Sequence, residues 1–126
     1  MKQAIVIKMT EGVPVANIVP FEKGTLEFYY EQLECETIDI VEAYGLTIQA
    51  EIIVDDEGLF KDNAVVNPLA SVAYGVFKHG QPIVGNAIIC KPYDTGDGID
   101  ETGFEPEEIN SIMAEITMKL MQGGEI

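Results

Sequence analysis

Residues 4–19 have the sequence AIVIKMTEGVPVANIV, and this stretch decides the fold class. Two runs rich in β-branched residues, 4–9 and 13–19, flank the turn signal Glu11-Gly12. This arrangement predicts two antiparallel strands that are joined as a hairpin. Pro14 lies in the second run, and proline cannot donate to a strand ladder. We therefore expect the second strand to lie at an edge of the sheet.

Three further stretches are predicted to be strands, at residues 37–41, 46–54 and 83–91. The run 46–54 alternates apolar and polar residues at most positions, which is typical of a half-buried strand. The run 83–91 is apolar at consecutive positions, so we expect it to be central, with Gly85 marking a bulge or a close backbone approach.

Helical periodicity predicts a first main helix and a short helix. Thr25 is a suitable N-cap for the first, and its buried face is expected to consist of Leu26, Tyr29, Tyr30 and Leu33. The short helix is expected to begin at Asn67-Pro68 and to end at Gly75, because asparagine caps well and proline suits the first helical position.

The last helix has the clearest start in the chain, at Pro106, with Glu107 and Glu108 favourably placed for the helix dipole. Its apolar stripe is Ile109, Ile112, Met113, Ile116 and Leu120. The elements together predict one α+β domain over residues 1–126. It would have a largely antiparallel sheet of about five strands, two main helices and one short helix, with the helices covering one face.

The charge of the chain excludes several classes of protein. Its 126 residues contain 22 acidic and 7 basic side chains, which gives a net charge of -15. A nucleic-acid-binding protein needs a basic surface, so direct nucleic-acid binding is not expected. No apolar run approaches the ~20 residues of a membrane span, so we expect no membrane association and a cytoplasmic location.

The residues that could act in catalysis do not form a recognisable pattern. His79 is the lone histidine and lies in a polar loop, where it lacks the partners that a catalytic base requires. Ser71 and Ser111 fall in predicted helices, outside any nucleophile elbow. Cys90 ends an apolar run, and Cys35 lies between two glutamates that oppose thiolate formation. We therefore expect no enzymatic activity and no cofactor.

Two groups of acidic residues are candidate partner-binding sites. One is a stripe on the first helix, and the other lies in a predicted loop over residues 92–103. Their members are Glu27, Glu31 and Glu34 in the stripe, and Asp94, Asp97, Asp100 and Glu101 in the loop. A solvated surface that aids solubility explains them simply, whereas the sharper interpretation is a surface that is complementary to a basic protein.

The acidic loops also allow a ligand-binding interpretation. Calcium prefers several carboxylate and carbonyl oxygens, and the loop at 94–101 is rich in carboxylates. Glycines stand where the EF-hand pattern needs acidic or amide residues, so the loop fits that pattern poorly and no metal site is predicted. A small-molecule or metal-binding module that uses the loops 54–58 and 94–101 remains the alternative.

Four segments resemble an uncharacterised domain-of-unknown-function family that is found in bacteriophages and mobile genetic elements. They are AIVIK at 4–8, VDDEGL at 54–59, NPLA at 67–70 and PIVGNA at 82–87. Their order and spacing are similar to that family over residues 2–92. The resemblance implies a phage or mobile-element origin and a cytoplasmic protein, and it implies no activity and no catalytic residues.

The function expected from the sequence is that of a non-enzymatic acidic interaction protein of phage or mobile-element type. Its partner would be a basic host protein, and the chain would act as a decoy or inhibitor of a DNA-binding protein. A stripe of carboxylates at ~6 Å intervals is comparable in scale to DNA phosphates. The oligomeric state stays open, with a homo-oligomer among the alternatives.

Overall fold

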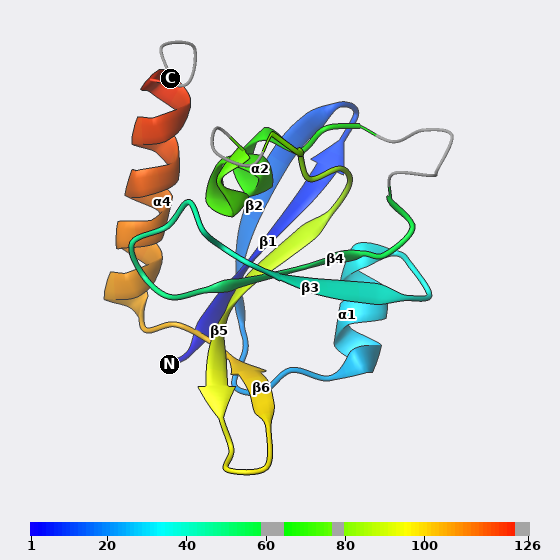
Figure 1. The fold of residues 1–126 in the computed structure, drawn as a ribbon, viewed down its shortest axis with the longest axis vertical. Helices are drawn as coiled ribbons and strands as arrows, with labels where there is room; N and C mark the ends of the chain where they lie inside the picture. Colours follow the sequence, from blue (N-terminus) through cyan, green and yellow to red (C-terminus); the bar gives the residue numbers. More distant parts are fainter. Residues whose placement is uncertain (59–64, 77–79, 123–126) are drawn as a thin grey trace.

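The computed structural model describes residues 1–58, 65–76 and 80–122 (Figure 1). His79 lies outside these residues. The described part contains six strands and three helices, which confirms the α+β class and adds one strand to the prediction. The strands are β1 (Gln3–Thr10), β2 (Val13–Pro20), β3 (Ile38–Glu42), β4 (Glu51–Asp55), β5 (Ala87–Asp94) and β6 (Ile99–Thr102). The helices are α1 (Leu26–Leu33), α2 (Pro68–Tyr74) and α4 (Pro106–Gln122).

The strands form an antiparallel sheet in the order β2-β1-β5-β4-β3, and β6 pairs with the far end of β5. The hairpin of β1 and β2 turns at Glu11 and Gly12, whose φ angles of 53° and 81° are typical of a type I′ turn. Because the register pairs Thr10 with Val13, the backbone of Pro14 points away from β1. The missing N–H of Pro14 therefore costs no ladder bond, and the predicted edge position of β2 is confirmed.

The predicted strand at 46–54 is shorter in the structure, where β4 begins only at Glu51. The alternating residues before it, Leu46 and Ile48, pack against the core without pairing as a strand. Thr47 is held by α4, because its backbone N–H and its hydroxyl both donate to the carboxylate of Glu115. The alternation of apolar and polar residues before Glu51 thus reflects packing of the apolar side chains against the core, and not pairing with a neighbouring strand.

The fifth strand lies further along the chain than predicted. Gly85 has a φ of 77°, and β5 begins after it, at Ala87. At its other end β5 continues to Asp94 and turns back into β6, with Lys91 opposite Thr102. The predicted loop over 92–103 is therefore largely a β-hairpin.

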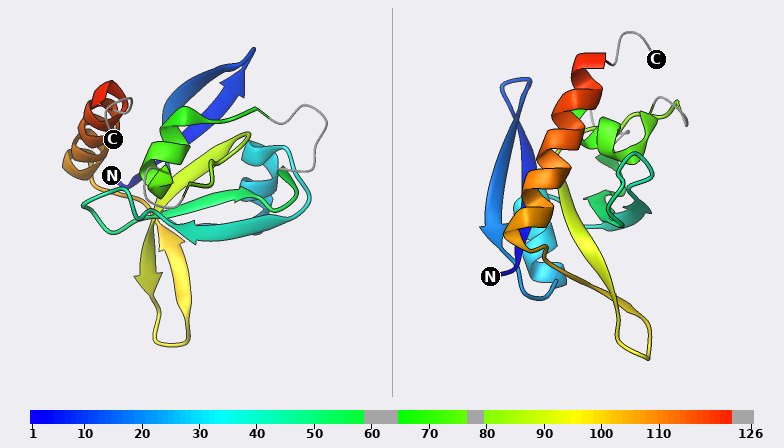
Figure 2. Two further views of the ribbon diagram at one scale, coloured as in Figure 1. Left: turned by 45° about the horizontal axis from the view of Figure 1, so that its top comes forward. Right: turned by 90° about the vertical axis from the view of Figure 1, so that its left-hand side faces the viewer.

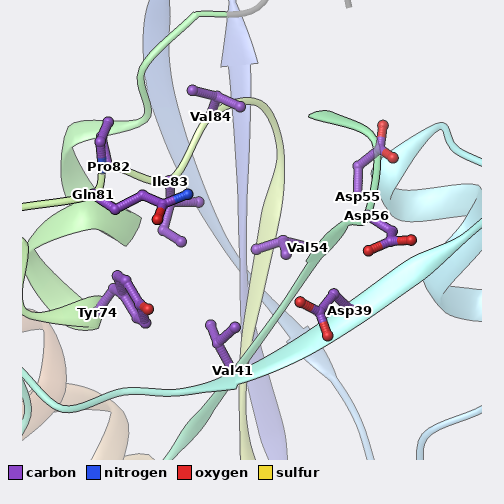
Figure 3. A pocket seen from close by; sticks show the side chains of 10 residues that line it. All are labelled: Asp39, Val41, Val54, Asp55, Asp56, Tyr74, Gln81, Pro82, Ile83 and Val84. Atoms are coloured by element: carbon purple, nitrogen blue, oxygen red, sulfur yellow. The ribbon is translucent and has the colours of Figure 1, made fainter. Parts of the chain in front are cut away.

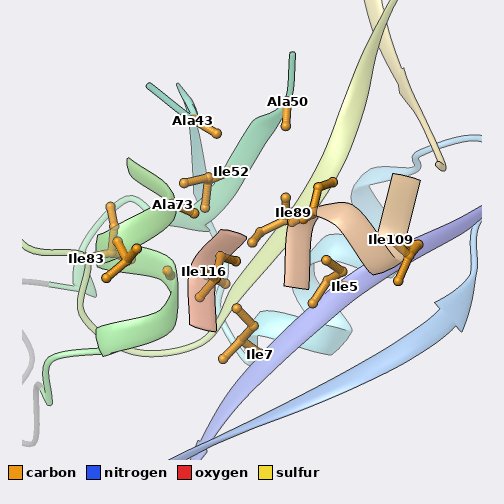
Figure 4. Packing of buried hydrophobic residues seen from close by; sticks show 14 of the residues in the cluster. Ile5, Ile7, Ala43, Ala50, Ile52, Ala73, Ile83, Ile89, Ile109 and Ile116 are labelled. Carbon is orange, nitrogen blue, oxygen red and sulfur yellow. The ribbon is translucent and has the colours of Figure 1, made fainter. Parts of the chain in front are cut away.

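The helices cover both faces of the sheet, so the prediction of a single covered face is wrong. One core contains Ile5, Ile52 and Ile89 beneath α2 and α4 (Figure 4). The other contains Val6 and Ile88 beneath α1 (Figure 2). Consecutive apolar residues in β1, β4 and β5 project to both faces, and each face must be removed from water.

Most of the predicted helical core is confirmed, with three exceptions. Tyr30 is only half-buried and lies in neither core. Ile112 and Ile116 of α4 have no exposed surface. Tyr29 and Leu33 hold α1 on the sheet, whereas Leu26 is 56% exposed and is not part of that face. Leu120 lies at the solvent-facing end of α4 and is 36% exposed.

Candidate functional site

The exposed side of α1 carries the first predicted group of carboxylates, which we call the α1 acidic face: Glu27, Glu31 and Glu34. All three are exposed. Glu27 lies in the first turn, and Glu34 is the C-cap in the left-handed conformation. The helix exists here because Thr25 caps it, with the Thr25 hydroxyl accepting from the N–H of Phe28 at 3.2 Å.

The charge of the α1 acidic face is not compensated within the helix. The last turn of α1 has no basic residue, and there Glu31 and Glu34 lie at the negative end of the helix dipole. Across the described ranges, no lysine lies within 4 Å of these carboxylates; the ion pairs found are Lys91–Glu108 and Lys119–Glu115. A cation bound at this end of α1 would offset the repulsion between these carboxylates and their unfavourable interaction with the helix dipole.

The second predicted group lies on the hairpin of β5 and β6, where its members have different surroundings. Asp94 and Asp97 are exposed near the tip, and Asp94 accepts from the N–H of Gly96 at 2.8 Å. Asp100 is half-buried in β6. Glu101 faces α1, where its carboxylate accepts from the hydroxyl of Tyr29 at 2.6 Å.

Glu101 joins β6 to α1 and to the segment before it. Its carbonyl accepts from the N–H of Gly24, and the Thr102 hydroxyl donates to the carbonyl of Glu22. These bonds fix β6 against the segment that leads into α1. The hairpin and the N-terminal end of α1 are therefore neighbours in space, although about 70 residues separate them in sequence.

Beneath α1, further acidic residues approach the core. Glu51 stands directly opposite Cys90 in the ladder and opposite Glu42 on its other side. One oxygen of Glu51 is buried without a hydrogen-bond partner in the described part of the chain. Burial raises the pKa of Glu51, and the negative charges of Glu101 and Glu42 raise it further.

The same surroundings suppress ionisation of the neighbouring tyrosine and cysteine. Burial raises the pKa of Tyr29 far above its usual range, and its hydrogen bond to Glu101 adds to the shift. Burial likewise raises the pKa of the Cys90 thiol. Cys90 is therefore an inert core residue, as its place in the sequence predicted, because the thiolate is the reactive form.

A cavity of about 260 Å³ opens beside β3 on the opposite face of the sheet (Figure 3). The carboxyl groups of Asp39, Asp55 and Asp56 lie on one side of it. Tyr74 and Ile83 lie on the other side. Strand pairing creates this arrangement, because Asp39 pairs with Val54 and so comes next to the end of β4.

The two acidic loops of the ligand-binding alternative do not share a cavity in the described part of the chain. Residues 54–56 line the cavity beside β3, and Gly58 lines a second one of about 390 Å³ together with Glu34. The hairpin residues 94–101 line neither. Among the residues that the structure places, no three histidine, cysteine or acidic side chains could hold one metal ion.

A family model described as a domain of unknown function, DUF3846, matches residues 1–117. The chain belongs to the DUF3846 family. The match includes all four resembling segments and extends beyond the expected 2–92 into most of α4. No curated protein and no solved structure matches the chain.

Membership of DUF3846 confirms that the chain belongs to a family of unknown function, and it brings no site residues to this chain. None of the helices in the described ranges combines the length and the apolar character needed to cross a membrane. Sequence reasoning missed the cavity beside β3. It selected 54–58 as an acidic loop, but Asp39 carried no signal until the register of β3 and β4 was known.

Proposed function

We propose that this DUF3846 protein is a cytoplasmic, non-enzymatic interaction protein that binds a basic partner through the α1 acidic face. The observation that supports this most directly is the uncompensated charge at the C-terminal end of α1. Carboxylates at that end of a helix each oppose the dipole by about 0.3–1 kcal/mol, and a bound cationic partner would remove this cost.

The partner class follows from the chemistry of the surface. Exposed carboxylates of Glu27 and Glu31 stand one helical turn apart on α1. Lysine- and arginine-rich surfaces that bind DNA phosphates complement such an array. We infer a phage or mobile-element protein that acts as a decoy or inhibitor of a host DNA-binding protein.

The non-enzymatic part of the proposal rests on how the potential nucleophiles are used. Ser71 is 3% exposed, and its hydroxyl is bonded to both the N–H and the carbonyl of Ile83. These bonds hold α2 against Ile83, in the segment that leads into β5. Cys90 has no exposed surface, and burial raises its pKa. Both groups serve the fold.

The test replaces the three carboxylates of the α1 acidic face with amides, in E27Q/E31Q/E34Q. Glutamine preserves size and helix propensity, so stability should hold or rise by ~0.2–0.5 kcal/mol per relieved pair. Tagged wild-type and variant chains would capture partners from host lysate, and each partner would be identified by mass spectrometry. Association kinetics with the purified partner and inhibition of its DNA binding are then measured at two salt concentrations.

The control variant E105Q/E107Q removes two exposed carboxylates at the start of α4, on the other face of the sheet from α1. Association should slow for the α1 variant at low salt and stay near wild type for the control. Equal association of wild type and the α1 variant at low salt would sink this face as the recognition site. The hairpin acids Asp94, Asp97, Asp100 and Glu101 would be tested next.

The alternative function, a small-molecule or metal-binding module, is favoured by one observation, the cavity beside β3. A ligand that binds only the native state must raise stability in proportion to its saturation. A melting curve with millimolar calcium tests the metal form of this alternative. A shift in Tm that a chelator reverses would favour it over the proposal.

A further inference from the structure

The cavity beside β3 has the size and lining that suit a single basic side chain. Its volume of about 260 Å³ is below the ~300–1,000 Å³ of pockets for drug-sized ligands. The apolar residues Val41, Val54 and Ile83 could contact an aliphatic stem. The carboxylates of Asp39 and Asp56 on one side could then receive a cationic head group (Figure 3).

The cavity borders a free edge of the sheet. Among the residues that the structure describes, β3 is the last strand in the order and pairs with β4 only. The N–H of Ala43 donates to the carbonyl of Ala50, and the N–H of Asp56 donates to the carbonyl of Thr37. These two bonds show that the backbone groups of Thr37 and Ala43 face β4. By alternation, the backbone groups of Ile38, Ile40 and Glu42 point outward.

The outward groups could form a ladder with an extended segment. In the described part of the chain, the N–H groups of Ile38 and Glu42 have no hydrogen-bond acceptor, whereas the N–H of Ile40 donates to the carboxylate of Asp39. The opposite edge differs, because in β2 prolines occupy outward positions and remove donors. The edge of β3 is thus the more competent of the two for strand addition.

Charge selects the occupant of this edge. Asp39 and Glu42 lie within β3 itself, and Asp55 and Asp56 lie at the end of β4 and directly after it. A second copy of β3 would bring like charges opposite one another, which disfavours self-pairing. A strand that carries lysine or arginine is complementary. On the opposite face Ile40, which is 40% exposed, could contact an apolar residue of that strand.

We infer that the cavity beside β3 binds a lysine or arginine side chain of an extended peptide that adds as a strand to the free edge of β3. A residue opposite Asp39 or Val41 projects on the cavity face, ~4.5–5.5 Å away between Cβ atoms. Its stem lies over Val41 and its charge meets Asp39 and Asp56. This site goes beyond the proposed function, because it lies on the other face of the sheet from α1.

The test uses an eight-residue peptide in which valine alternates with lysine and threonine. Its dissociation constant is measured against wild type and against D39N/D56N, in which the amide oxygen introduced at position 39 can still accept from the N–H of Ile40. We expect at least tenfold weaker binding to this variant. The control E105Q/E107Q, with equal loss of charge at two exposed carboxylates at the start of α4, should bind as wild type does.

Two further arms separate strand addition from simple charge attraction. E42P removes an outward N–H as well as a charge, whereas E42Q removes the charge alone, so E42P should weaken binding at least fivefold more than E42Q. Melting curves verify that both fold. Replacing lysine by norleucine in the peptide should lower affinity at least tenfold, and a free aliphatic diamine should bind more weakly than the peptide.

Equal loss of binding in all the carboxylate variants would overturn the inference, because it would show attraction without a site. Equal affinity for E42P and E42Q would overturn strand addition, and a diamine that binds as well as the peptide would show a small-molecule site instead. These results leave the partner of α1 untouched. Failure of E27Q/E31Q/E34Q in partner association would conversely leave the peptide measurements unchanged.

Discussion

The two faces of the sheet differ in how their charge is handled. On the face beneath α2 and α4 the core is larger and mostly aliphatic, and Glu108 beside it forms an ion pair with Lys91 at 3.1 Å. On the face beneath α1, a smaller core combines Phe21 and Tyr29 with aliphatic residues and Cys90. Its rim holds Glu51 and Glu101, and the described lysines do not pair with them.

This difference separates stability from recognition. The long helix α4 combines apolar burial with paired charges, so its face contributes most to the free energy of unfolding. In the described part of the chain, the acids at the unfavourable end of the short helix α1 have no ion pair, a feature that stability alone does not explain. The comparison predicts that truncation on the α4 face is costly, and that removal of acids on the α1 face is tolerated or stabilising.

The largest effect is expected for Ile116→Ala. Ile116 has no exposed surface and lies in the core beneath α4. Its truncation should lower the free energy of unfolding by about 2–5 kcal/mol, because it removes buried methyl groups and leaves a cavity. Chemical denaturation measures the change. Met118→Ala, two residues along and 59% exposed, should change stability by less than about 0.5 kcal/mol. Equal stability of the two variants would show that α4 does not anchor this face.

A smaller effect is expected on the other face for Tyr29→Phe. The change deletes only the hydroxyl that donates to Glu101, and it leaves a partly buried carboxylate without its donor. The expected loss is about 1–3 kcal/mol. Tyr93→Phe is the control, because Tyr93 is 53% exposed on β5. If both variants melt like wild type, the bond between α1 and β6 does not hold the hairpin in place.

The two faces should also respond oppositely to pH. The raised pKa of Glu51 means that the folded state resists its ionisation, so the penalty is absent below the unfolded pKa of ~4.3 and grows as pH rises through the folded pKa. Glu51→Gln should therefore raise Tm relative to wild type at pH 7 and have little effect at pH 4.

Glu108 gives the matched variant of opposite sign. The hydrogen bond from the Glu105 N–H and the contact with Lys91 lower the pKa of Glu108, despite some burial. Its stabilisation is present above the unfolded pKa and is lost as pH falls through the folded pKa. Glu108→Gln should lower Tm at pH 7, with the difference shrinking towards pH 3. The same sign for both variants at pH 7 would contradict the comparison.

Much of the fold followed from the sequence because the deciding signals are local. The turn at Glu11-Gly12, the caps at Thr25 and Asn67 and the start of α4 each depend on nearby residues. The hairpin of β5 and β6 escaped prediction, because Pro92 and a run of acids are typical of a loop. Its stability depends on the distant contacts of Glu101 with Tyr29 and Gly24.

The candidate sites divide in the same way. The α1 acidic face could be predicted, since helical periodicity alone places Glu27 and Glu31 on one side. The cavity beside β3 could not, because Asp39 and Tyr74 meet there only through sheet register and the placement of α2. The same holds for Glu101, which was expected in a solvated loop but is bonded to Tyr29.

The smallest effect concerns the end of α1, where stability can be raised. Glu34 has φ 55° and ψ 50°, a left-handed conformation that disfavours most side chains and suits glycine. α2 ends at Gly75 in the same region, at φ 92°. Glu34→Gly should therefore stabilise the protein by about 0.5–1 kcal/mol, by releasing backbone strain and removing a charge from the negative end of the dipole.

Glu31→Gly, three residues earlier, should instead lower stability by about 1 kcal/mol, because glycine in a helix interior costs that much. Chemical denaturation of the two variants gives the sign of each change in the free energy of unfolding. A loss of stability in Glu34→Gly would mean that its side chain, which accepts from Asn86 at 3.4 Å, contributes more to the fold than the strain costs. The end of α1 would then resemble the α4 face, with an acid retained for stability rather than for a partner.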